Sequence, residues 1–247
     1  MFETSLIFKT FLILSSQFGL IFLGCFALID QAKKSYMTGN KLFGIEFIAR
    51  KNSKNELDLI PIYLDKNRVE DPKVKSEKVT PLFLLWVISL LAMVVLAHKS
   101  LFAGLLLMTL ASISFVPLLA LVMLEMDEND GVRATQITFT ISLLAAAVGM
   151  YSGIDFGFLR GFLFCGLLAV ILFNTARIFI GLSNSILRIK TFFGAGLFTL
   201  FLVYDFNQLV KLDDRGFNDW NTALHLSINI YLDVINLLLE ILAAMGE

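Results

Sequence analysis

The sequence predicts an all-α integral membrane protein with seven transmembrane helices and a small inserted β-hairpin. Hydrophobic residues make up 57% of the 247 residues, whereas soluble domains contain about 45–50%. Seven apolar stretches are long enough to cross a bilayer as helices, which takes roughly 20 residues each. The charges are concentrated, since 19 of the 41 Asp, Glu, Lys and Arg residues lie between Asp30 and Val79. A net charge of −1 argues against a nucleic-acid partner, which would need a basic surface.

The predicted spans cover the chain in order, with one long interruption. They are residues 5–29, 81–97, 101–124, 134–151, 153–182, 189–210 and 222–244. The first apolar run is too long for the core of a cleaved signal peptide, which indicates a retained helix. We expect one seven-helix membrane domain over residues 1–247, with an extramembrane insert at 30–80.

Two short runs of alternating apolar and polar residues, 43–50 and 56–64, lie inside the insert. Residues 51–55 between them have turn chemistry, so the pattern predicts a two-stranded antiparallel hairpin over 42–64. Pro61 must lie at an edge or a bulge because it lacks an N–H group. An ordered insert packs on its own protein or on a partner, and a mobile linker is the alternative. We expect residues 42–64 to contact protein partners.

Several residues in and between the spans have structural explanations. Pro117 is expected to kink the third span, and Asp155 fits an N-cap at the start of the fifth. Gly194, Ala195 and Gly196 are small residues suited to close helix packing in the sixth span. Four acids are expected to form a solvated loop before the fourth span: Glu125, Asp127, Glu128 and Asp130.

A polar stripe distinguishes the last span. Five polar residues recur at steps of three or four in an otherwise apolar segment: His225, Asn229, Asp233, Asn236 and Glu240. A helix places residues with this spacing on one face. A carboxylate near the middle of a bilayer is costly, so Asp233 needs a polar partner or a water-filled path. Because the stripe is too polar for lipid, we expect the other six helices to surround this one.

The preceding span supplies a partner for Asp233. That span carries Asp205, and the polar linker 211–221 returns the chain as an antiparallel neighbour. The two carboxyl groups are expected to meet and share one proton, because like charges a few ångströms apart cannot both ionise cheaply. The alternative is that Asp205 lies near the membrane interface and is hydrated.

Both segments resemble one family. Residues 204–208 read Tyr-Asp-Phe-Asn-Gln and resemble the YD-x-x-Q end of the sixth helix in transmembrane Bax-inhibitor-motif proteins. Residues 227–237 resemble that family's seventh-helix signature, A-L-x-I-Y-L-D-I-I-N-L. The resemblance implies a seven-helix membrane protein in which six helices surround a central C-terminal helix. Family members include pH-sensitive calcium leak channels, whose paired aspartates correspond to Asp205 and Asp233.

The chain departs from the family pattern in its second span. Calcium-conducting members carry an arginine there that contacts the aspartate pair, whereas no basic residue occurs between Leu82 and Ala97. Arg177, inside the fifth span, is the candidate replacement as a counter-ion. The alternative is that its long stem carries the charge to the membrane interface.

These features predict a pH-modulated cation (calcium) leak channel of Bax-inhibitor type, gated by the Asp205–Asp233 pair. The two acids would sense pH and offer the oxygen ligands that Ca²⁺ prefers. The other members of the stripe would support the same face: His225, Asn229, Asn236 and Glu240. The alternative function is a non-conducting regulatory or structural subunit of a larger membrane complex, docked through the 30–80 insert. The sequence contains no nucleophile and base set that indicates an enzyme, so no catalytic residue is expected.

The expected surroundings follow from the same composition. The lipid bilayer is the main partner, and Ca²⁺ is the one ion expected to bind, at Asp205 and Asp233. Both cysteines, Cys25 and Cys165, lie in apolar spans and do not indicate a disulfide framework or a metal site. A chain of apolar helices favours a bacterial inner membrane, with an organelle membrane as the alternative.

Overall fold

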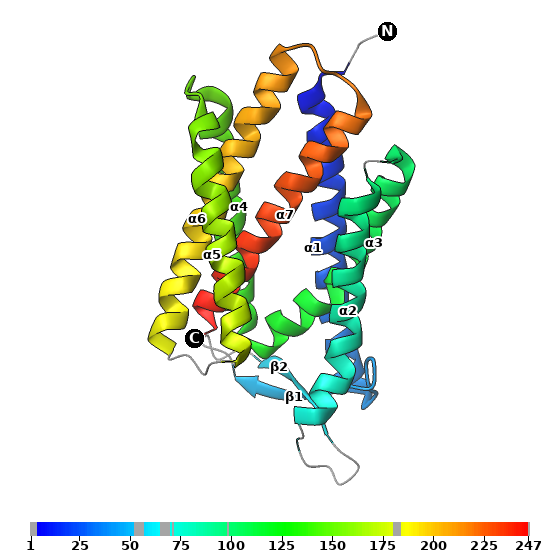
Figure 1. The fold of residues 1–247 in the computed structure, drawn as a ribbon. Helices are drawn as coiled ribbons and strands as arrows, with labels where there is room; N and C mark the ends of the chain where they lie inside the picture. Colours follow the sequence, from blue (N-terminus) through cyan, green and yellow to red (C-terminus); the bar gives the residue numbers. More distant parts are fainter. Residues whose placement is uncertain are drawn as a thin grey trace. The chain divides into compact units, whose positions relative to one another are not determined.

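The computed structural model describes residues 4–51, 57–64, 70, 72–97, 99–179 and 184–246. The described chain forms seven long helices and one two-stranded sheet (Figure 1), with a helical content of 83%. The helices are α1 (Leu6–Thr38), α2 (Pro72–Leu96), α3 (Leu101–Glu125), α4 (Glu128–Tyr151), α5 (Leu159–Phe179), α6 (Asn184–Asp214) and α7 (Trp220–Met245). Each of these seven is long and apolar enough to cross a membrane. The predicted seven-span membrane fold is therefore confirmed.

The helices on both sides of the insert extend beyond the predicted spans. α1 continues to Thr38, and α2 begins at Pro72 rather than at Pro81. Lysine, glutamate and glutamine form helices well, so a change from apolar to polar residues need not end a helix. Proline is tolerated at the first position of a helix, where its missing N–H group has no partner to lose. The insert at 30–80 is consequently helical at both of its ends.

The predicted β-hairpin is present in the middle of the insert. Strand β1 (Glu46–Lys51) pairs antiparallel with β2 (Leu57–Ile62), and Phe47 lies opposite Pro61. Each strand of a two-stranded sheet has a free edge, where a proline can be accommodated. Apart from Lys51, the turn expected at residues 51–55 lies outside the described residues.

The four acids expected in a loop lie mainly at helix ends. Glu125 is the last residue of α3 and Glu128 is the first residue of α4. The Asp127 side chain accepts a hydrogen bond at 3.0 Å from the backbone N–H of Asn129, in the first turn of α4. Acidic groups are stabilising at a helix N-terminus, where unpaired N–H groups point outward. The expectation of an acidic loop was therefore wrong for Glu125, Glu128 and Asp130, which are helical. Asp127 lies in the link, where its side chain binds the first turn of α4.

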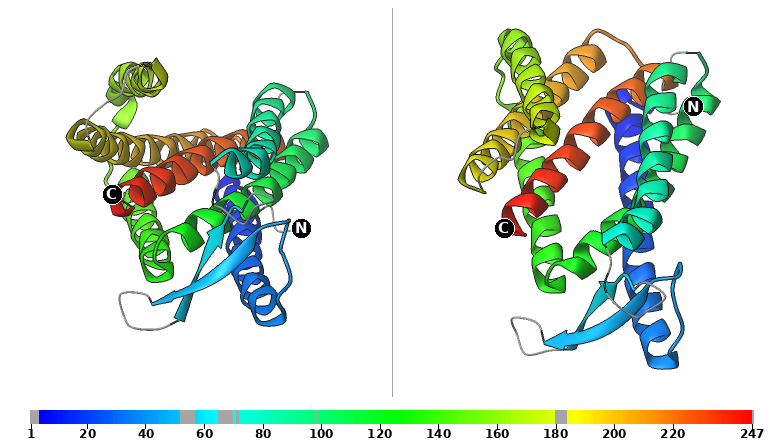
Figure 2. Two further views of the ribbon diagram at one scale, coloured as in Figure 1. Left: turned by 90° about the horizontal axis from the view of Figure 1, so that it is seen from below. Right: turned by 60° about the horizontal axis from the view of Figure 1, so that its bottom comes forward.

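The chain divides into two compact units. The C-terminal unit comprises Arg133–Glu247 together with the start of the chain up to Phe11, and the N-terminal unit comprises Leu12–Val132. Within the C-terminal unit, α6 and α7 run antiparallel along each other, and α5 lies against α6 (Figure 2). The encirclement of α7 by the other six helices stays a prediction.

Polar contacts fasten the first turn of α1 within the C-terminal unit. The Leu6 N–H donates to Asp213 Oδ1 at 2.9 Å. Lys9 Nζ donates to the carbonyl oxygen of Asn218 at 2.7 Å, and the same ammonium lies 5.5 Å from the centre of the Trp220 ring. These contacts hold the start of α1 against the link between α6 and α7.

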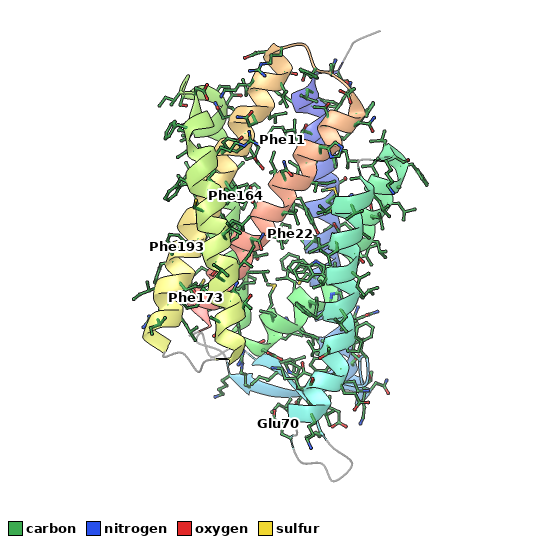
Figure 3. All side chains as sticks on the ribbon, viewed as in Figure 1. Phe11, Phe22, Glu70, Phe164, Phe173 and Phe193 are labelled. Atoms are coloured by element: carbon green, nitrogen blue, oxygen red, sulfur yellow. The ribbon has the colours of Figure 1, made fainter. Side chains whose placement is uncertain are left out.

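The outer surfaces of α5 and α6 carry many large apolar side chains. Phe164 on α5 and Phe193 on α6, both labelled in Figure 3, are exposed. Inside, Leu163 and Val170 of α5 pack against Leu197 of α6. Exposed aromatic rings on these helices are suited to acyl chains, which demand no hydrogen bonds.

Helix packing and one buried polar group organise the N-terminal unit. α2 and α3 lie side by side, and the rings of Trp86 and Phe115 stack with their centres 5.1 Å apart. Gln17 of α1 is buried and donates to Thr109 Oγ1 at 3.2 Å, while Ser112 Oγ donates to Gln17 Oε1 at 2.9 Å. A buried amide needs such partners, so these bonds set the position of α1 against α3.

Candidate functional site

The polar stripe of α7 begins just after a capped helix start. The Asp219 carboxylate accepts from the backbone N–H of Thr222 at 2.8 Å and from its hydroxyl at 2.7 Å. These hydrogen bonds lower the pKa of Asp219 below its ordinary value of 3.8. The cap satisfies N–H groups that the first turn of a helix would otherwise leave unpaired. It therefore fixes where α7 starts.

The five residues of the stripe differ in burial. Asp233 and Glu240 are buried, His225 and Asn236 are half-buried, and Asn229 is exposed. The helix as a whole is well covered, since its buried residues run from Ala223 to Leu242. The two carboxylates are thus the members of the stripe that are most shielded from the surroundings.

Asp205 of α6 and Asp233 of α7 lie next to each other. Only 6% of Asp205 and 8% of Asp233 is exposed, and their side chains are joined by a hydrogen bond. A hydrogen bond between two carboxyl groups needs a proton on one of them, because an ionised carboxylate only accepts. The pair in this arrangement therefore holds at least one proton.

Tyr204 and Asp205 both lie on α6, but their side chains face different parts of the structure. Tyr204 lines an open groove of about 500 Å³ between α5 and α6, whereas Asp205 is directed toward Asp233. The groove is lined by Arg160, Gly161, Leu163, Phe164, Leu167, Phe201 and Tyr204. Its lining is mostly apolar, whereas Asp205 lies on the side of α6 that faces α7.

Asn207, two residues after Asp205, connects three backbone groups. Its amide nitrogen donates to the carbonyl oxygens of Gly149 at 3.1 Å and Ile154 at 3.0 Å. Its amide oxygen accepts from the backbone N–H of Phe156 at 3.1 Å. Sequence reasoning did not single out Asn207, although an amide inside an apolar span was the available signal. Asn207 holds the link between α4 and α5 beside the segment that carries Asp205.

That link contains a short 3-10 helix, η1 (Phe156–Phe158), which precedes α5. Asp155 caps it by accepting from the Gly157 N–H at 2.7 Å, which confirms the predicted N-cap. The Lys211 ammonium of α6 also binds this carboxylate. Lys211, followed by the Gly157 N–H, lowers the pKa of Asp155 below 3.8. A second polar contact therefore holds the α4–α5 link to α6.

Glu240, at the far end of the stripe, pairs with a base that sequence reasoning missed. Lys190 Nζ of α6 lies 2.5 Å from Glu240 Oε1. The available signal was a lysine just inside an apolar span, where a charge needs a partner. The side chain of Arg177, the predicted counter-ion, lies outside the described part of the structure. In the described residues, no group of three or more His, Cys, Asp or Glu gathers to hold a metal ion.

The insert is fastened to its own helices in the N-terminal unit. Arg50 of β1 donates to the fully buried Asp58 of β2 at 3.1 Å and to the carbonyl oxygen of Glu125 at 3.3 Å. Tyr63 donates to Glu125 Oε1 at 3.1 Å, and Lys75 of α2 pairs with the same carboxylate. The hairpin is therefore held on the end of α3 by charge-assisted bonds. Its predicted contact with protein partners stays a prediction.

Comparison with known proteins places these features in a wider group. The family model for the inhibitor of apoptosis-promoting Bax1 matches residues 3–247. An uncharacterized membrane protein of Vibrio cholerae is 29% identical over 114 residues, which cover 46% of this chain and 48% of that protein. Protein LIFEGUARD 1 of Arabidopsis thaliana is 36% identical over 95 residues, 38% of each chain. Protein LIFEGUARD 4 of the same plant is 32% identical over 90 residues, 36% of this chain and 34% of that one. The matched stretches thus span about half or less of these relatives.

Proposed function

Because the chain belongs to the Bax-inhibitor family of membrane proteins, we propose that it provides a pH-modulated leak pathway for cations, with Ca²⁺ as the cargo. The observation that carries the proposal is the hydrogen-bonded pair of buried carboxyl groups, Asp205 and Asp233, inside spanning helices. Ionisable groups within spanning helices mark ion pathways and proton relays. Carboxylate oxygens are also the ligands that Ca²⁺ prefers.

The proton shared by the pair acts as the gate. With one proton present, the hydrogen bond holds α6 and α7 together at Asp205 and Asp233. Loss of that proton leaves two anions in contact, and their repulsion favours separation of the helices or entry of a cation between them. Rising pH removes the proton, so the cation flux should increase as the pH rises. The two carboxyl groups titrate as a pair, and neither acts alone.

Calcium flux into liposomes tests this gate. The purified protein is reconstituted with a calcium dye inside the vesicles, and the flux is measured from about pH 6 to about pH 8, a range that the upper titration step of a buried carboxyl pair can reach. Wild type should show flux that rises with pH. Asp233→Asn keeps the shape of the side chain but removes its charge, so the pH dependence should disappear. Asp214→Asn, at an exposed acid of the same α6 helix, is the matched control and should behave as wild type. A pH-dependent flux that Asp233→Asn leaves unchanged would exclude the paired-carboxyl gate.

A non-conducting subunit of a larger membrane complex is the second candidate. It is supported by two apolar side chains on the insert, Phe43 and Ile48, which are 58% and 45% exposed. Exposed apolar residues on an ordered extramembrane element are typical of contact surfaces. This function predicts no flux in wild type, and a smaller complex after Phe43→Ser with Ile48→Ser, measured by the mass of the detergent-extracted particle. A particle of unchanged mass together with calcium flux in wild type would exclude it.

The proposal also includes the membrane in which the protein lies and the class of protein to which it belongs. The Vibrio cholerae relative is described as a membrane protein, which supports a bacterial inner membrane, because outer-membrane spans are β-barrels. Transport through the carboxyl pair needs no nucleophile, and we take the protein for a transporter of ions and not an enzyme. Fractionation of a bacterial host that expresses the chain checks the proposed location in the inner membrane.

A further inference from the structure

A second carboxylate lies on the same face of α7 as the gate. Glu240 follows Asp233 by two helical turns, or about 10 Å along the axis. It is 6% exposed, and its neighbour on α6 is the base Lys190, with Nζ 2.5 Å from Oε1. Two buried carboxylates of α7 therefore face α6, one paired with an acid and the other with an ammonium group.

A glycine on α6 makes the second contact possible. A Cβ atom on Gly194 would lie 2.6 Å from Glu240 Cδ and 2.7 Å from Oε1. Real Cβ atoms do not approach that closely, so the carboxylate occupies space that any other residue at this position would fill. Lys190 lies one turn before Gly194 on α6, and its long stem brings the ammonium to the same place. The site is built from both helices.

The ion pair with Lys190 involves one of the two carboxylate oxygens of Glu240. Glu240 Oε2 is buried and has no hydrogen-bond partner in the part of the chain that the structure describes. An ionised carboxylate offers about four acceptor sites, and a buried charge is stabilised only when those sites are satisfied. The free oxygen therefore marks a place where a further donor or cation can bind.

We propose that Glu240 is a second cation-binding carboxylate of the pathway, and that the Lys190 ammonium occupies it as a tethered plug. The inference rests on the proposed leak function. A hydrated cation such as Ca²⁺ that moves between Asp233 and the end of α7 would meet Glu240 next and would have to displace Lys190. The ammonium group is a compact point charge on a flexible stem, which suits it to leave and return. Lys190 thus competes with the cargo for one carboxylate.

Terbium binding tests the plug without any flux measurement. Tb³⁺ stands in for Ca²⁺, and its luminescence is titrated on the purified protein in nanodiscs. Lys190→Met keeps the apolar stem and removes the charge, so it should tighten Tb³⁺ binding by about tenfold or more, within the ordinary range of coupling between sites. Lys190→Arg should leave binding near the wild-type level. The double variant Lys190→Met with Glu240→Gln should lose the gain. Unchanged Tb³⁺ affinity in a folded Lys190→Met protein would overturn the proposal and leave a purely structural ion pair.

Two glycine variants test the plug in a second way, because they keep the charges of both Lys190 and Glu240. Gly194→Ala should push the Glu240 carboxylate away from Lys190 and tighten Tb³⁺ binding as well. Gly196→Ala is the matched control, because nothing lies within 4 Å of a Cβ built there. Equal tightening of Tb³⁺ binding by Gly194→Ala and Gly196→Ala would contradict the plug. Unchanged Tb³⁺ affinity in both variants would also contradict it.

The outcomes separate this inference from the leak pathway itself. A Glu240-dependent gain in Tb³⁺ binding without any calcium flux in wild type would support the Glu240 site and exclude the pathway. A pH-dependent flux abolished by Asp233→Asn, with no gain in Lys190→Met, would support the gate and exclude the plug.

Discussion

The side-chain amide of Asn207 donates a hydrogen bond at 3.0 Å to the carbonyl oxygen of Ile154, 53 residues earlier in the chain. Ile154 lies in the link between α4 and α5, where the chain leaves one helix before starting the next. Backbone groups in such a link have no helical partner, and they are costly when left unpaired away from water. Asn207 supplies the missing partner from α6, two residues after Asp205.

Replacing Asn207 should loosen that link. Asn207→Ala removes bonds to Gly149, Ile154 and Phe156, and we expect a loss of about 1–3 kcal/mol, the usual cost of leaving buried polar groups unpaired. The melting temperature in detergent measures the effect. Asn174→Ala, at an exposed amide of α5, is the control. Equal melting temperatures for the two variants would show that the Asn207 bonds do not stabilise the fold.

Gly149 allows α4 to approach α6 closely. A Cβ at this position would lie 2.5 Å from the carbonyl oxygen of Val203, a backbone atom that cannot rotate away. Gly149→Ala should therefore separate the helices and cost about 1–3 kcal/mol, as overpacking usually does. Gly161→Ala on α5 meets open space and should be neutral or gain up to about 1 kcal/mol from helix propensity. Thermal unfolding of both variants checks the difference, and a stable Gly149→Ala protein would contradict it.

The hairpin should respond unequally to the loss of either charge in its ion pair. Asp58 has a fully buried side chain, whereas 27% of the Arg50 side chain is exposed. Arg50→Ala leaves a buried carboxylate without the guanidinium, while Asp58→Ala leaves an arginine that water can reach. We expect Arg50→Ala to be the more damaging, with a cost of about 1–3 kcal/mol.

Hydrogen exchange of the amides in β1 and β2 measures that difference. Lys34→Ala breaks the exposed Lys34–Asp30 pair and should change stability by less than about 1 kcal/mol. Faster exchange after Asp58→Ala than after Arg50→Ala would reverse the expected order.

Acid should weaken the contact between Asp155 and Lys211. The pKa of Asp155 is lowered from 3.8 in the folded protein, first by Lys211 and then by the Gly157 N–H. A carboxyl group with a lowered folded pKa stabilises the fold above its unfolded pKa, and the contribution is lost as the pH falls through the folded value. Asp155→Asn should therefore lower stability at neutral pH and remove part of the loss below about pH 4, near the ordinary pKa of the group. Unfolding midpoints measured across that range check the slope. An unchanged slope in Asp155→Asn would contradict the assignment.

The sequence by itself determined the seven spans and the hairpin. Apolar length and alternation are local properties of the chain, and each span had to be a helix because a bilayer leaves no other way to satisfy its backbone. Because these properties are local, they do not define the residues at which each helix begins and ends. The polar ends of α1 and α2 continued as helices beyond Ile29 and before Pro81 because helix propensity, unlike hydropathy, does not stop at the membrane surface.

Sequence periodicity also put five polar residues on one face of α7, but it could not rank them. Asp233 and Glu240 are buried while Asn229 is exposed, although all three share the stripe. Burial depends on what the neighbouring helix offers at each level. The opposing residue is Asp205 in one case and Gly194 with Lys190 in the other.

Only the tertiary structure decided which polar groups meet. Lys190 pairs with Glu240 at 2.5 Å, although they are 50 residues apart in the chain, and Asn207 reaches back to the α4–α5 link. Such pairs depend on how far one helix is shifted along and rotated about its neighbour. Close packing fixes that shift, at glycines such as Gly149 and Gly194 where no side chain keeps the helices apart. The hydropathy of the sequence does not indicate this shift, because the same apolar residues would allow many relative positions of the two helices.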